Sequence, residues 1–80
     1  MNNYRGVGIY RIRFNVTGTH VHCRLFYAKE PRTTFAKCGD FTVRRGVEFR
    51  DLIETFVHVE FVGDDERVGI ADAITQGATP

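Results

Sequence analysis

The chain has 80 residues, of which 42% are hydrophobic and 26% are charged, a composition that predicts a globular protein and excludes extended disorder. No apolar run approaches the roughly 18 residues of a membrane-spanning helix, and the first residues lack the apolar core of a signal peptide. We therefore expect a cytoplasmic protein that is one domain, residues 1–80, and whose cysteines are thiols.

The net charge of +1 conceals two halves of opposite charge. Residues 1–46 contain nine basic and two acidic side chains, a balance of +7, whereas residues 47–80 contain two basic and eight acidic side chains, a balance of −6. Such a division indicates either charged partners or mutual attraction of the two halves within the fold.

Two strands with one apolar face each are predicted by the alternation in residues 9–16 and 19–27. A two-residue loop at Thr17 and Gly18 would join them as a hairpin. That loop pairs Phe14 with Val21, so that each apolar residue of one strand meets an apolar residue of the other.

A second hairpin is predicted in residues 33–45, TTFAKCGDFTVRR, with a turn at Gly39 and Asp40. In this arrangement Cys38 points toward the core and falls opposite Cys23. Opposed Cβ atoms in a ladder lie about 4.5–5.5 Å apart. We expect both thiols to be buried, close together and reduced.

A helix over residues 47–57 is indicated by four apolar side chains at helical spacing, namely Phe49, Leu52, Ile53 and Phe56. This stripe should pack on the apolar face of the sheet, against Ile12, Phe14, Val21, Cys23 and Val43. Residues 58–62 predict a last strand, and a short terminal helix should follow with Asp64 or Asp65 as its N-cap.

The predicted fold class is α+β. Four strands, a helix and a last strand form a four- to five-stranded, mainly antiparallel sheet with the helix packed on one face. The ordered core should cover about residues 9–75, with the C-terminal residues frayed.

Metal and cofactor sites are not predicted. His20 and His22 point away from Cys23 on their strand, whereas zinc in proteins takes three or four protein ligands. A Cys-His nucleophile is equally disfavoured because the thiol points inward. We find no convergent set of titratable groups of the kind that acid–base catalysis needs, and we expect no enzyme.

The outward face of the predicted sheet is basic and aromatic. Its candidate binding residues are Arg11, Arg13, His20, His22, Arg24, Phe26, Phe35, Lys37 and Arg44, accompanied by Asn15 and Thr42. Rings among cations are typical of a surface for single-stranded nucleic acid, because bases stack on rings and phosphates bind arginines. The same pattern fits two other hypotheses: Glu60 or the acidic terminal segment neutralises the face, or Phe26 and Phe35 mark a protein or homodimer interface.

An acidic surface is the second candidate, built from Glu48, Asp51, Glu54, Glu60, Asp64, Asp65 and Glu66, with Asp72 further along the chain. Such carboxylates could present themselves to a basic groove of another protein. A solvated helix face explains the same residues.

The segment THVHCRLF…TFAKCGDFTVRRGVEF, within residues 9–62, resembles in size and texture the small accessory proteins encoded by tailed phages. The resemblance implies a stoichiometric binder that blocks a host nucleic-acid-handling or defence complex. We therefore expect a non-enzymatic protein-binding module. The alternatives are a single-stranded nucleic-acid-binding protein and a small oligomeric virion protein.

Overall fold

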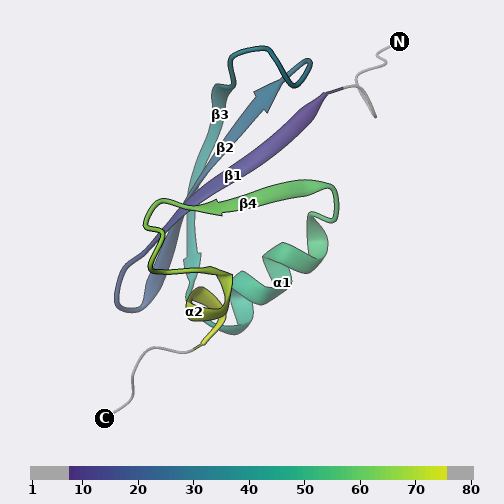
Figure 1. The fold of residues 1–80 in the computed structure, drawn as a ribbon. Helices are drawn as coiled ribbons and strands as arrows, with labels where there is room; N and C mark the ends of the chain where they lie inside the picture. The colour runs from purple at the N-terminus through teal and green to yellow at the C-terminus, as the bar shows by residue number, and fades with distance from the viewer. Residues whose placement is uncertain (1–7, 76–80) are drawn as a thin grey trace.

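The computed structural model describes residues 8–75. Its elements follow in the order β1 (Ile9–Val16), β2 (His20–Ala28), β3 (Ala36–Arg44), α1 (Val47–Thr55), β4 (Val59–Gly63) and α2 (Ile70–Ile74). The strands form one sheet in the order β3-β2-β1-β4, with α1 and α2 on the same side of it (Figure 1). The predicted α+β class, with one sheet, a packed helix and a short C-terminal helix, is confirmed. The predicted fraying of residues 76–80 lies outside the described residues.

The sheet is mixed, and its pairing is mainly antiparallel as predicted. β2 pairs antiparallel with both β1 and β3, whereas β4 pairs parallel with β1. A parallel neighbour requires a crossover connection, and α1 leads the chain from the β3 edge of the sheet to the β4 edge. As a result, part of the acidic second half lies directly beside the basic strand β1.

The first hairpin has the predicted faces but a different register. Val16 pairs with Val21 and Phe14 pairs with Cys23, so the predicted pairing of Phe14 with Val21 is wrong. The backbone N–H of Thr17 donates to the carbonyl of His20 at 2.8 Å, which moves the tight loop to residues 18–19. A shift of two residues keeps every side chain on its face, so alternation alone cannot distinguish the two registers.

The second predicted hairpin does not form. Residues 36–44 are one continuous strand, β3, which pairs along β2 with a bulge: Leu25 faces Gly39 and Phe26 faces Lys37, leaving Cys38 as the extra residue. Gly39 has a packing role, because a Cβ at this position would lie 3.2 Å from the Cβ of Leu25. The glycine here allows two strands to approach closely. The sequence pattern had instead predicted a turn at Gly39.

The core lies between the sheet and the helices, as predicted. Ile12, Phe14, Val21, Cys23 and Phe49 are at most 1% exposed. Leu52, Ile53, Phe56 and Val43 pack against this cluster, which confirms the predicted contact of the helix stripe with the sheet. The rings of Phe14 and Phe49 lie 5.1 Å apart, and Phe61 of β4 meets Phe49 edge-on at 5.9 Å.

The terminal helix begins later than the predicted N-cap residues. α2 starts at Ile70, its N-cap is Gly69, and the carboxylate of Asp72 accepts a hydrogen bond from the Gly69 backbone N–H at 2.8 Å. Asp64 and Asp65 instead lie in the loop between β4 and α2, so their predicted capping role is wrong. Their carboxylates are thereby available to side chains elsewhere.

Candidate binding face

The outer face of the sheet is the face turned away from α1 and α2. Strand alternation and the observed register assign it Arg11, Arg13 and Asn15 of β1; His20, His22, Arg24 and Phe26 of β2; Lys37, Asp40, Thr42 and Arg44 of β3; and Glu60 and Val62 of β4. Phe35, just before β3, reaches the same face through its contact with Arg11. All nine candidate binding residues predicted from the sequence therefore share one face.

Arg11 joins the two edges of the outer face. Its Nε donates to the Glu60 carboxylate of β4 at 2.9 Å, while its guanidinium carbon lies 4.2 Å from the centre of the Phe35 ring. Phe26 is the cross-strand neighbour of Arg11 on β2. A cation over a ring contributes about 0.5–1 kcal/mol at an exposed site. The arginine thus contacts Glu60 and Phe35 and has Phe26 as its cross-strand neighbour.

Arg13 and Arg24 stand directly opposite each other on β1 and β2. Like charges at facing ladder positions repel, and here a single carboxylate, that of Asp64, lies between them. Arg13 Nε donates to Asp64 Oδ1 at 3.2 Å, and Arg24 Nη2 donates to Asp64 Oδ2. The Nε atom of Arg24 is buried and has no hydrogen-bond partner within residues 8–75. The pair therefore retains net positive charge and an unused donor.

Asp40 forms a second ion-pair cluster on β3. Its carboxylate lies 2.5 Å from His22 Nε2 and 3.0 Å from Lys37 Nζ. The hydrogen bond to His22, followed by that to Lys37, lowers the pKa of Asp40 from its ordinary value of 3.8. The sequence placed Asp40 in a hairpin turn, whereas the structure places it on the outer face of the sheet.

Carboxylates therefore neutralise much of the face. Asp40, Glu60 and Asp64 bind the Arg11, Arg13, Arg24, Lys37 and His22 side chains. With Arg44 included, five permanent cations face three carboxylates, which leaves a charge of +2. Of the alternatives raised by the sequence, neutralisation by Glu60 and the acidic terminal segment is what the structure shows. Strand alternation already indicated that Glu60 points outward, but no local signal identified Asp64.

The predicted acidic surface is divided among three places. Glu48, Asp51 and Glu54 are exposed on α1, Glu60 and Asp64 serve the outer face, and Asp65 and Glu66 belong to the following loop. Asp65 accepts hydrogen bonds from the side chain and the backbone N–H of Arg67, which lower its pKa. These carboxylates do not form one continuous surface, so the acidic half is the weaker candidate for a binding site.

The two cysteines occupy opposite environments. Cys23 is buried, and this burial raises the pKa of its thiol to about 11. Cys38, at the β3 bulge, is exposed, and the cross-strand neighbour of Cys23 is Phe41. The predictions that both thiols are buried and that they face each other are therefore wrong for Cys38. Both cysteines are free thiols.

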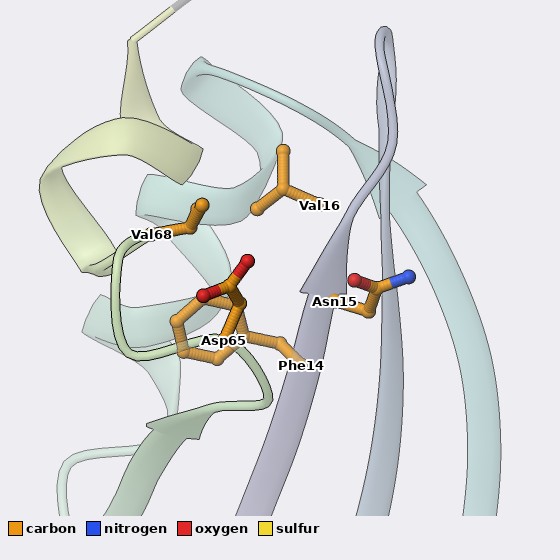
Figure 2. A pocket seen from close by; sticks show the side chains of 5 residues that line it. All are labelled: Phe14, Asn15, Val16, Asp65 and Val68. Carbon is orange, nitrogen blue, oxygen red and sulfur yellow. The ribbon is translucent and has the colours of Figure 1, made fainter.

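A small pocket lies beside the end of β1. Figure 2 shows Phe14, Asn15 and Val16 of β1 on one side of it and Asp65 and Val68 of the 64–69 loop on the other. Its volume is about 50 Å³. Ligand pockets typically measure about 300–1,000 Å³, so this one is of a size for water rather than for a substrate.

Within residues 8–75 no group of three or more His, Cys, Asp or Glu side chains is arranged to hold a metal ion. The helices of this part of the chain are too short or too polar to cross a membrane. Comparisons with protein-family models, with curated proteins and with solved structures found no match to this chain. The case for a function therefore rests on the geometry of the outer face.

Proposed function

We propose that this chain is a non-enzymatic protein-binding module of the phage-inhibitor type, and that the outer face of its sheet binds the partner protein. The observation that carries the proposal is that carboxylates of the chain itself already bind the arginines of this face. Asp64 and Glu60 already hold Arg11, Arg13 and Arg24 at the places where phosphates of a nucleic acid would bind.

The aromatic rings and the hydrogen-bond donors that the carboxylates leave unused on this face are suited to contact with a protein surface. Phe26 and Phe35 provide half-buried rings, and the arginines keep donors that the carboxylates do not use. Arginine and aromatic residues are enriched in protein interfaces, where they are the usual hot spots. The residual charge of +2 favours a partner with acidic groups at the rim of its contact.

A pull-down from host lysate, with and without nuclease treatment, tests the proposal. The captured protein should remain after nuclease treatment. Phe26→Ala and Phe35→Ala should each reduce capture at least tenfold, because truncated hot spots cost about 2 kcal/mol or more. Val57→Ala is the matched control, since Val57 is 71% exposed in the turn after α1, and it should leave capture unchanged. Equal capture by all variants would refute the outer face as the interface.

Single-stranded nucleic-acid binding is the second candidate, and the facing pair of Arg13 and Arg24, which share one carboxylate, favours it. If phosphates bind between Arg13 and Arg24, the Asp64 carboxylate competes with them. Asp64→Asn should then strengthen binding of a labelled oligonucleotide, and affinity should fall steeply with salt. Phosphate contacts bind strongly at about 50 mM salt. If neither the native chain nor this variant binds the oligonucleotide under that condition, the candidate is rejected.

A further inference from the structure

Among the described residues, β3 is an edge strand of the sheet. Within the described residues it pairs with β2 alone, and its nine residues run to the turn before α1 (Figure 1). An edge strand presents unpaired backbone N–H and C=O groups and is therefore a site at which another strand can pair. Charged side chains and the bulge at Cys38 restrict which strand that can be.

The hydrogen bonding of Arg44 identifies the outward-facing backbone groups. Its N–H donates to the Glu48 carboxylate of α1 at 2.9 Å and hence faces away from β2. In an antiparallel ladder the groups of alternate residues face the same way, so those of Thr42 and Asp40 also face outward. Within residues 8–75 β3 pairs with no strand other than β2, so these two N–H groups have no ladder partner.

The residues along this open edge are complementary to themselves. Suppose that the segment Asp40–Arg44 pairs antiparallel with the same segment of a second copy and that the pairing is centred on Thr42. Asp40 then lies opposite Arg44, Phe41 opposite Val43, and Thr42 opposite Thr42. Opposite charges, apolar pairs and facing threonines all favour cross-strand pairing. Within residues 8–75 the Arg44 guanidinium takes part in no ion pair, so it is available to such a partner.

We propose that β3 is a self-association site, at which a second copy of this chain pairs antiparallel about Thr42 and joins the two sheets into one. The interface has the two-fold symmetry of ordinary homodimers. Centring the pairing on Asp40 would oppose two like charges, and centring it on Phe41 would leave Asp40 opposite Thr42. Charge therefore selects the register about Thr42. The site lies on the sheet edge and does not depend on the proposed partner of the outer face.

Glu48 sets the strength of this association. In the dimer the Arg44 N–H donates to the Asp40 carbonyl of the second copy, so its hydrogen bond to the Glu48 carboxylate must break. Glu48 thus acts as an intramolecular competitor that covers one donor of the edge in the monomer. Glu48→Ala removes the competitor and should tighten the dimer several-fold.

Sedimentation equilibrium of the full chain over a range of concentrations tests the site. The native chain should form a reversible dimer. Asp40→Arg and Arg44→Asp should each weaken it about tenfold, because each replaces two attractive cross-strand pairs by two repulsive ones. An equimolar mixture of the two variants should restore the dimer, since arginine at 40 of one chain then meets aspartate at 44 of the other.

Two further variants complete the experiment. Arg32→Glu reverses a charge in the exposed loop before β3 and should leave the dimer unchanged. Thr42→Pro removes one outward N–H and should abolish the dimer while circular dichroism shows a retained fold. A native chain that stays monomeric up to about 1 mM overturns the proposal. So does a dimer that survives Thr42→Pro, or a mixture of the charge variants that fails to associate.

Discussion

The two faces of the sheet differ in what holds their side chains in place. On the core face, Phe14 and Val21 are buried against Phe49 of α1 by apolar contacts that need no particular partner atom. On the outer face, Arg13 and Arg24 depend on one carboxylate supplied by a distant loop. Burial follows from the local alternation of residue types, whereas charge pairing follows from how the whole chain folds. The comparison therefore predicts large stability losses on one face and small ones on the other.

Phe49→Ala should cause the largest loss. Phe49 is fully buried between Phe14 and Phe61, so its truncation should cost about 3–5 kcal/mol of unfolding free energy, a large part of the stability of so small a domain. Urea unfolding measures the change. Phe35→Ala on the outer face is the control and should cost about 1 kcal/mol or less, the worth of an exposed cation–ring contact. Equal losses would contradict the assignment of the two faces.

The cysteines give the next largest effect. Cys23 lies on the core face, and its thiol has a pKa of about 11 against an ordinary value of 9.0. Because the unfolded chain releases this proton first, stability should fall by up to about 1.4 kcal/mol per pH unit between pH 9 and 11. Cys23→Val should remove this part of the slope.

Titration with a thiol reagent at pH 8 should modify Cys38 rapidly in the folded chain and Cys23 only after unfolding.

If both cysteines react with the thiol reagent at the same rate in the folded chain, the assignment of Cys23 to the buried core is contradicted. The Cys23→Val comparison also separates the cysteine from the other ionisable side chains, which are present in both proteins.

The core face could be predicted because strand and helix periodicity act over a few residues. Alternation in residues 9–16 and 19–27 identified both strands and their faces, and the stripe from Phe49 to Phe56 identified the helix surface that packs on them. The register of the hairpin could not be predicted, because a shift by two residues leaves every face unchanged.

The residues of the outer face were predicted, whereas its neutralisation was only one of the alternatives that the sequence left open. Gly39 and Asp40 form a common turn pair, yet here the glycine serves a close contact with Leu25 and the aspartate joins the sheet. The partners of Arg11 and Arg13 lie 49 and 51 residues further along the chain. They become neighbours only when β4 docks parallel to β1, which no local pattern encodes.

Asp64→Asn should therefore have a smaller effect than either core change. It removes the carboxylate shared by Arg13 and Arg24 and leaves two facing cations, at a cost of about 1 kcal/mol or less. The loss should shrink in 1 M salt, because salt screens both the attraction and the repulsion. Asp51→Asn, on α1 at 3.8 Å from Arg50, is the control and should change stability less. A salt-independent loss at Asp64 would point to packing rather than charge.

The smallest effect concerns Asp40, which is solvent-exposed on the outer face. Its hydrogen bonds to His22 and then to Lys37 keep its pKa below 3.8, so its contribution to stability is present above that pH and is lost as the pH falls through the lowered pKa. Carboxyl NMR titration should show this pKa rising toward 3.8 in His22→Ala, and rising less in Lys37→Ala. The order follows from geometry, because His22 Nε2 lies 2.5 Å from the carboxylate and Lys37 Nζ lies 3.0 Å from it. If both variants leave the pKa of Asp40 unchanged, the carboxylate does not bind these cations in solution, and the outer face carries more uncompensated positive charge than the structure indicates.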